Sequence, residues 1–340
     1  MGRKDKSYSK DLHQQAYDKL TSMQAFGESK KEAMADGTAD NKIFSYNTYD
    51  TYWKHTKYFT KWLGENHPDV TTLKKAAAYV NEWLQSRVDE GKSAWTVQTE
   101  AKAMGKLFGI RPDDPNYFTP PQRHRADIKR SRVDTERDKH FSVTNNDELI
   151  KFCKGTGLRR FELEDLCGRQ LMTRNQIDPE IARIEAIPVD ARTKIERKYL
   201  DALRDAKFFD AEYFIHVERG KNGRIRVSPI IGPNVDQIVE RIQNTGADEK
   251  VWKYVNGNAD VHGYRGDYAT RIYKDHAREI DQIPFDKVNQ GTGRKYQSEV
   301  YTCRKDEAGK KLDKAAMLIC SKALGHNRLE VVANNYIRGL

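Results

Sequence analysis

Six side chains of the types that handle phosphate chemistry are spread over the chain beyond residue 150. In chain order they are Arg159, Lys221, His262, Arg265, His326 and Tyr336. Breaking a phosphodiester bond without a metal ion requires a nucleophile, cations for the charge on the non-bridging oxygens, and an acid for the leaving oxygen. Arginine stays charged at any working pH and presents a planar fork to phosphate oxygens. The set therefore contains every component that such a reaction needs.

Spacing adds information for the residues that are close in sequence. His262 and Arg265 are three apart, which places both side chains on one face of a helix. Taken alone, a histidine such as His262 more often satisfies a hydrogen bond in a core, and it is the surrounding set of residues that favours a functional role. Arg160 follows Arg159 directly, and adjacent helical residues are turned by about 100°. We therefore expect Arg160 to lie on the surface or against a DNA backbone.

Local motifs surround these side chains. They are Thr156-Gly157-Leu158-Arg159, Gly220-Lys221-Asn222-Gly223, His262-Gly263-Tyr264-Arg265, Leu324-Gly325-His326 and a Tyr near the C-terminus. In this order the motifs resemble the catalytic signature of the tyrosine recombinase, or phage integrase, family. Each motif alone is a weak signal, but five in order are a strong one. The resemblance covers residues 141–340, and the region before it fits the family's core-DNA-binding domain in size and position.

The resemblance implies roles for the cationic and imidazole side chains. Arg159 and Arg265 would clamp the scissile phosphate. His262 would handle a proton or orient the phosphate, and His326 would be a further hydrogen-bond donor to it. The family needs neither a metal ion nor ATP for this reaction, so no cofactor is expected.

The resemblance also implies the nucleophile and the acid. Tyr336 would attack phosphorus to form a 3′-phosphotyrosyl enzyme, although a tyrosine near the C-terminus can equally be a packing aromatic. Lys221, at a hairpin tip, would protonate the departing 5′-hydroxyl, with Arg219 as the competing side chain. His326 and Tyr336 are ten residues apart, or about 15 Å along a straight helix. We therefore expect a bend or loop between them, near Asn334 and Asn335.

Composition favours a polyanionic partner. The 340 residues contain 60 Lys and Arg against 50 Asp and Glu, a formal net charge of +10, and the mean hydropathy is -0.87. Residues 1–140 carry 25 basic and 20 acidic side chains, and the remainder carries 35 and 30. The excess is therefore about equal in both parts, which favours two domains that both contact nucleic acid.

Other classes of protein do not fit the composition. The four cysteines are too sparse for a disulfide framework and lack the spacing of a zinc site. No apolar run approaches the roughly 20 residues that cross a bilayer, and no apolar region follows the basic start of the chain. We expect a cytoplasmic, nucleoid-associated protein.

The chain is predicted to contain two domains and a linker. Residues 1–110 show helical periodicity, with spans at 46–63, 73–88 and 94–108 and an extra helix at 10–23. Residues 111–140 are rich in proline and then basic, and form either a solvated hinge or a strap along a phosphate backbone. The basic side chains predicted to bind DNA there are Arg123, Arg125, Lys129, Arg130 and Arg132.

Residues 141–340 are predicted to form the catalytic domain. Two β-rich segments, 213–217 and 224–231, flank an Asn-Gly turn and predict a hairpin. Helices dominate elsewhere, including 191–206, and residues 292–314 form an added loop or hairpin. The fold class is therefore mainly α with a small β-hairpin or sheet (α+β).

The resemblance implies a site-specific recombinase that acts on double-stranded DNA with paired sites as a homotetramer. It would integrate or excise a mobile element or resolve replicon dimers, with a role for accessory DNA-bending proteins left open. Two alternatives remain: a type IB topoisomerase-like enzyme, and a DNA-binding protein that has lost catalysis. The residues do not reveal the target sequence, or whether a C-terminal tail is exchanged between protomers.

Overall fold

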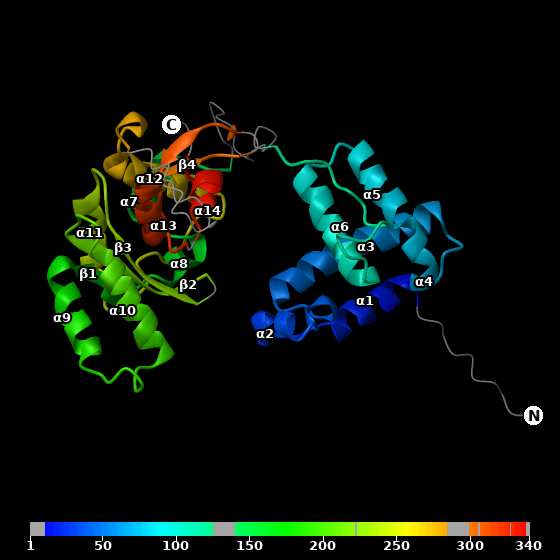
Figure 1. The fold of residues 1–340 in the computed structure, drawn as a ribbon, viewed down its shortest axis with the longest axis horizontal. Coiled ribbons are helices and arrows are strands. Elements are labelled where there is room, and N and C mark those ends of the chain that lie inside the picture. The colour runs from blue at the N-terminus through cyan, green and yellow to red at the C-terminus, as the bar shows by residue number, and fades with distance from the viewer. Residues whose placement is uncertain are drawn as a thin grey trace, which may run out of the picture. The chain divides into compact units, whose positions relative to one another are not determined.

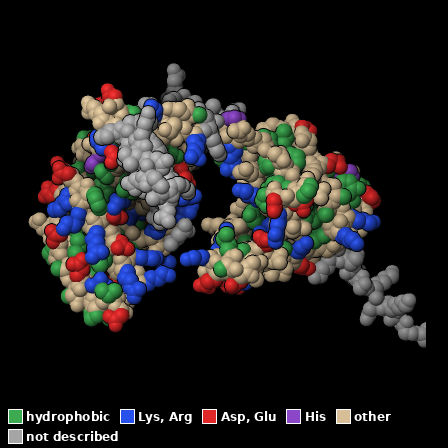
Figure 2. Space-filling view, viewed as in Figure 1, with side chains coloured by type: hydrophobic (Ala, Val, Ile, Leu, Met, Phe, Trp, Pro, Cys, Tyr) green, Lys and Arg blue, Asp and Glu red, His purple; other side chains and the backbone are tan. Residues whose placement is uncertain are grey.

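The chain divides into two compact units, each described here by itself. The computed structural model describes residues 11–124, 140–221, 223–283, 299–304, 307–326 and 328–337. The units comprise Met1–Arg130 and Ser131–Leu340, so the division falls within the predicted linker. Most of the described residues are helical and the strands form small antiparallel sheets, which confirms the predicted fold class. In each unit, basic side chains are interspersed with acidic ones on the face shown in Figure 2.

The named elements of the first unit are all helices among its described residues (Figure 1). Its α-helices are α1 (Leu12–Ser22), α2 (Lys30–Ala35), α3 (Tyr46–Asn66), α4 (Leu73–Ala76), α5 (Val80–Asp89) and α6 (Ala94–Phe108). Helix α6 has the predicted bounds, because Ser93 caps its first turn and Gly109 ends it in the left-handed conformation. The span predicted at 73–88 is instead interrupted by a 3₁₀ turn between α4 and α5. Phe59, Leu63 and Trp83 are central to the core.

The second unit contains eight α-helices within its described residues, and five strands (Figure 1). The helices are α7 (Asp147–Thr156), α8 (Arg160–Asp165), α9 (Arg174–Glu185), α10 (Lys194–Ala206), α11 (Val235–Gln243), α12 (Val261–His276), α13 (Lys314–Ala323) and α14 (Leu329–Asn335). The strands are β1 (Leu171–Thr173), β2 (Tyr213–Gly220), β3 (Arg224–Pro229), β4 (Val300–Thr302) and β5 (Lys311–Asp313).

A three-stranded antiparallel sheet of order β1-β2-β3 organises this unit. The predicted hairpin is present as β2 and β3, with Phe214 opposite Pro229 and Gly220 opposite Arg224. Strands β4 and β5 form a separate hairpin within the segment predicted as an added loop or hairpin. Helix α12 packs against α7 and α13, so residues far apart in sequence are brought to one end of the hairpin.

Hydrophobic residues from these helices and strands form the core around the sheet. Phe214 and Tyr268 are fully buried, and Leu324 and Tyr336 belong to the same cluster. The hydroxyl of Tyr268 donates a hydrogen bond to the carbonyl of Pro229 (2.8 Å), which ties α12 to β3. Among the described residues, no helix is both long and apolar enough to cross a membrane.

Gly157 allows α12 to pack tightly against the end of α7. It ends α7 with φ +59°, and a Cβ at this position would overlap the Tyr268 ring. Any other residue would meet both the left-handed penalty and a clash with a fully buried ring.

We predict that Gly157→Ala lowers the free energy of unfolding of the full chain by about 3 kcal/mol or more. The matched control is Gly309→Ala, because Gly309 has φ +90° but no atom within 4 Å of a Cβ. The control meets the backbone penalty alone and should cost about 1 kcal/mol. Denaturant titration of both variants measures the difference, and equal losses would refute the clash.

Candidate functional site

Tyr336 lies directly after α14, where the chain folds back onto α12. The phenol is 6% exposed, and its ring centroid is 5.2 Å from the rings of both His262 and His326. The direction of the chain changes between Ala323 and Leu329, before α14 begins. The predicted break between His326 and Tyr336 is therefore present, but it precedes Asn334 and Asn335, which α14 includes.

Arg265 lies at the centre of this arrangement, on α12. Its side chain is 1% exposed, and its two terminal nitrogens donate to the carbonyl oxygens of Gly157 and Leu324. The Arg265 guanidinium carbon lies 5.3 Å from the centre of the Tyr336 ring. Asp260 caps the first turn of α12 by accepting from the Gly263 N–H, which fixes the start of the helix.

Arg159 approaches the same point from α8. Its Nη2 donates to the Leu324 carbonyl (3.4 Å), which Arg265 also contacts. Arg159 is the N-cap of α8, and its backbone N–H donates to the Glu162 carboxylate (2.8 Å). The Glu162 carboxylate therefore orders both the backbone and the side chain of Arg159, whose Nη1 lies 2.8 Å from Oε1.

A third guanidinium, that of Arg226 on β3, completes the group. It forms a bidentate ion pair with Glu162, with nitrogen to oxygen distances of 2.8 and 2.6 Å, and both side chains are buried. Its Nε donates to Ser228, whose hydroxyl donates to the Ala323 carbonyl. Although burial alone would raise the pKa of Glu162, hydrogen bonds and charge from Arg226 lower it to about 2.

Positive charge exceeds negative charge in this buried group. Arg159, Arg226 and Arg265 face the single carboxylate of Glu162. Burial, and then the charges of Arg226 and Arg159, lower the pKa of Arg265 to about 10. An anion bound here would supply the missing counter-charge and would offset the cost of desolvating three cations.

Two nitrogen atoms of this group, Arg265 Nε and His326 Nε2, are among the buried side-chain atoms of the described residues that have no hydrogen-bond partner. Buried polar groups are almost always paired, so atoms of this kind indicate a missing ligand. A tetrahedral oxyanion carries several acceptors and a charge of the required sign. The arrangement is therefore suited to bind a phosphate group beside Tyr336.

His326 is positioned by α13. Its backbone N–H and C=O both pair with Ser321, at 2.8 Å each. Burial, and then the charges of Arg265 and Arg159, lower the pKa of His326 to about 3. The imidazole is thus neutral near pH 7, so it can donate one hydrogen bond but is a poor proton acceptor.

His262 and Arg160 border a hollow at the start of α12. His262 is exposed, and the hollow, of about 270 Å³, is also lined by Arg159 and Arg265. The Arg160 guanidinium donates to backbone carbonyls of residues 255–259, including those of Asn256 and Ala259 at 2.9 Å. Arg160 thus braces the loop that precedes α12, and its contact with DNA stays a prediction.

Lys221 is exposed at the tip of the β2–β3 hairpin. The neighbouring Gly220 lies against the ion pair, because a Cβ there would be 3.3 Å from Arg226 Nη1 and 3.4 Å from Glu162 Oε1. The structure therefore brings five of the six predicted catalytic residues together. The sixth, Lys221, lies on a turn whose Gly220 packs on the Arg226–Glu162 pair. Among the described residues, Lys221 itself makes no contact with these side chains.

Of the basic residues predicted to bind DNA from the linker, the structure describes Arg123 alone. Its guanidinium lies 5.6 Å from the centre of the Trp95 ring in the first unit. The others, Arg125, Lys129, Arg130 and Arg132, lie outside the described residues. Their role stays a prediction.

Sequence reasoning missed Glu162 and Arg226. A carboxylate three residues after Arg159 has the spacing of a capping box, which is a readable signal. Arg224 and Arg226 are two residues apart on a strand, so both lie on the same face of the sheet. This spacing does not show whether that face is buried. The pairing between Glu162 and Arg226 depends on the tertiary fold, so spacing alone could not predict it.

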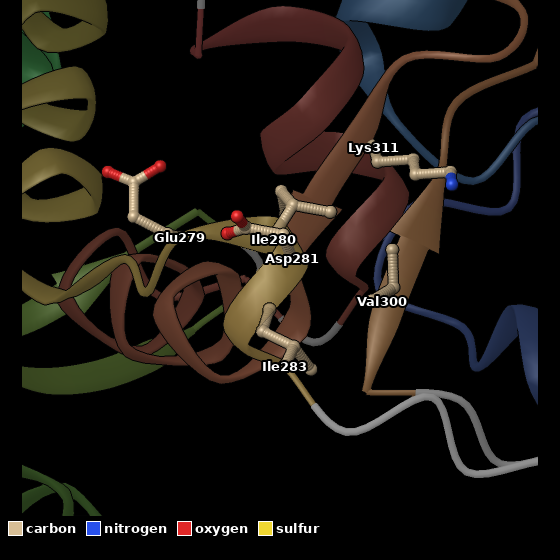
Figure 3. Close-up of a pocket in the computed structure, with 6 residues that line it drawn as sticks. All are labelled: Glu279, Ile280, Asp281, Ile283, Val300 and Lys311. Carbon is tan, nitrogen blue, oxygen red and sulfur yellow. The ribbon is translucent and has the colours of Figure 1, made fainter.

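The described residues of this unit also line hollows away from the start of α12. One of about 290 Å³ is lined by residues of α10, β3, α13 and the loop after α13, including Lys198, Arg224 and His326. A larger one, of about 550 Å³, lies between the residues before Ile283 and the β4–β5 hairpin (Figure 3). The larger hollow is lined by none of the predicted site residues. Among the described residues, no group of three or more His, Cys, Asp or Glu could hold a metal ion.

Comparisons with known proteins add little. No family model matches the chain, and no curated protein matches it. Among solved structures, the chain is similar to one described as the crystal structure of XerA recombinase, at 11% identity. The match covers 96% of this chain and 94% of that chain, with a TM-score of 0.26. A likeness at this score carries no weight, so the function must be inferred from the site itself.

We predict that the Glu162 ion pair makes the chain sensitive to acid. The folded pKa of about 2 lies below the unfolded value of 4.5. The contribution of Glu162 to stability is therefore fully present above pH 4.5 and is lost as the pH falls toward 2. In Glu162→Gln, the free energy of unfolding should be about 3 kcal/mol lower than in wild type at pH 5, and about equal at pH 2.

The control for this experiment is Glu240→Gln, at an exposed position on α11. It should match wild type at every pH within about 0.5 kcal/mol. Denaturant titrations between pH 2 and 6 measure both differences. A Glu162→Gln deficit that does not depend on pH would show that the lost charge is not the cause.

Proposed function

We propose that this chain is a DNA strand-exchange enzyme that cleaves and rejoins DNA through a 3′-phosphotyrosyl intermediate. The observation that carries the proposal is the meeting of Tyr336 with three guanidiniums, two buried and one half-buried, that a single carboxylate faces. Tyr336 lies beside Arg265 and two histidines, and Arg159 shares a backbone carbonyl with Arg265. A phosphodiester bound to the arginines would lie within reach of the phenol oxygen.

The step balances as an in-line exchange at phosphorus. A bond forms between phosphorus and the Tyr336 oxygen, and the bond from phosphorus to the 5′-oxygen breaks. His262 accepts the phenol proton, because His326, with a pKa of about 3, is a poor acceptor. His326 donates to the phosphate, and Lys221 protonates the leaving oxygen. A 5′-hydroxyl from another strand then reverses the step, with no ATP required.

Arg159 and Arg265 supply the charge stabilisation. Negative charge increases on the non-bridging oxygens in the transition state, and fixed cations in a buried site stabilise it more strongly than water does. Glu162 and Arg226 hold Arg159 in place before DNA binds, so little reorganisation is required when the reaction occurs.

The wider biological role follows from the resemblance of the motifs. We propose that the chain acts on double-stranded DNA with two paired sites as a homotetramer, and serves integration or excision of a mobile element or resolution of dimers. Relaxation of plasmids without any specific site would indicate a topoisomerase instead.

We predict that Tyr336→Phe abolishes the covalent DNA adduct and leaves DNA binding within about twofold of wild type. Without the hydroxyl no phosphotyrosyl bond can form, while the ring still packs against Arg265. Duplexes made from the DNA that flanks the gene, nicked so that cleavage is trapped, provide the substrate, and denaturing gels measure the adduct. The matched control is Tyr254→Phe, which alters a highly exposed tyrosine. If Tyr336→Phe forms as much covalent adduct as wild type, Tyr336 is not the nucleophile.

We predict that Arg159→Ala lowers the cleavage rate by about 10²- to 10³-fold, the usual effect of removing one donor to a developing oxyanion. Binding to the same duplex should weaken far less, because many other phosphate contacts remain. Arg183→Ala, which removes an exposed cation paired with Glu180, serves as the control. Equal losses of cleavage and binding in Arg159→Ala would indicate a DNA anchor rather than a catalytic cation.

A further inference from the structure

The connection between β1 and β2 is far longer than the sheet requires. These strands are antiparallel neighbours, and two residues suffice to join such strands. Here residues 174–212 intervene and form α9 and α10, which lie as a helical pair beside the sheet (Figure 1). The proposed chemistry so far assigns nothing to this pair.

Helix α10 is firmly attached to the hairpin. Its apolar face buries Leu200 and Leu203 in the core around the sheet. The Tyr199 ring stacks on His216 of β2, with ring centroids 4.2 Å apart and an angle of 16° between the planes. Thr193 and Glu196 form a capping box that fixes the start of the helix. The polar side chains of α10 are therefore held at defined positions relative to β2 and β3.

One of these side chains reaches the turn that carries Lys221. The Lys198 ammonium donates to the Gly223 carbonyl (2.9 Å), directly after the turn. The Gly223 N–H donates back to the Gly220 carbonyl (2.9 Å). At the other side of the turn, Gly220 packs on the pair formed by Glu162 and Arg226. The turn is thus held at both ends, by Lys198 and by the buried ion pair.

We propose that Lys198 is a positioning residue that holds the β2–β3 turn so that Lys221 can protonate the leaving 5′-oxygen. This inference rests on the proposed function. A general acid must lie within hydrogen-bond reach of the oxygen, and a displacement of about 1 Å can cost about 10²-fold in rate. Gly223 is exposed, and a glycine has many backbone conformations of its own. The Lys198 contact removes part of that freedom before DNA binds.

The first test measures the turn in the free, full-length protein. Lys198→Met removes the donor but keeps the apolar stem of the side chain. Backbone amide exchange in a peptide covering residues 217–224 should become about tenfold faster, while peptides from α12 and α13 stay unchanged. Lys198→Arg keeps a donor, and Lys194→Met alters an exposed lysine of the same helix, so both should match wild type. Unchanged exchange in Lys198→Met would overturn the proposal.

The second test measures whether the effect of Lys198→Met on the cleavage rate depends on protonation of the leaving group. The trapping duplex from the gene's flanking DNA is made with either oxygen or sulfur at the bridging 5′ position of the mapped cleavage site. A thiolate leaves without protonation, so a sulfur substrate does not need the acid. With oxygen, Lys198→Met should cleave about 10- to 100-fold more slowly than wild type. With sulfur, its rate should return to within about threefold of wild type.

The outcomes separate this inference from the proposed function. If sulfur rescues Lys221→Ala but not Lys198→Met, Lys198 does not act through Lys221, and the inference fails while the proposed function stands. If Lys198→Met weakens DNA binding as much as it slows cleavage, Lys198 is a DNA contact and the inference also fails. If wild type forms no adduct on Tyr336 with any duplex, the proposed function itself is wrong.

Discussion

The ion pair between Glu162 and Arg226 is the interaction on which the site depends. Glu162 also accepts from the backbone N–H of Arg159, the N-cap of α8, so one carboxylate fixes the backbone of Arg159, its guanidinium and the buried guanidinium on β3. Burying charge in this way is costly unless the charge is fully paired. With three guanidiniums and one carboxylate, the pairing is incomplete, and the remaining positive charge is what makes the site suited to an anion.

The fold provides this geometry through two points where the chain must reverse. Gly157 follows α7 and Gly325 follows α13, and both adopt positive φ. Each lies against a large side chain of the second unit. Gly157 packs on Tyr268 and Gly325 packs on Arg226. These reversals present the carbonyls of Gly157 and Leu324 to Arg265. Stability and chemistry therefore depend on the same few backbone positions.

Much of the fold was predictable because it depends on local rules. Helix α6 begins after Ser93 and ends before Gly109, as its capping residues indicate. The hairpin follows from an Asn-Gly pair between β-rich segments. The interruption between α4 and α5 was not predictable, because Ala76 to Tyr79 have good helical propensity although residues 77–79 form a 3₁₀ turn. Five of the predicted catalytic residues meet in space, but their roles stay predictions.

The parts that sequence reasoning missed depend on contacts that the tertiary fold or the local backbone path creates. The partner of Glu162 is 64 residues away on a strand, and no spacing rule links them. The reversal before α14 is set by Ser321 pairing with both backbone groups of His326, which a linear pattern does not reveal.

The most direct test of the central claim is mass spectrometry of the protein trapped on a nicked duplex from its own flanking DNA. After digestion with trypsin and nuclease, Tyr336 lies in the peptide Leu329–Arg338. The account predicts that this peptide carries a nucleotide through a 3′-phosphate on Tyr336. A nucleotide on any other residue, or on none, would contradict it.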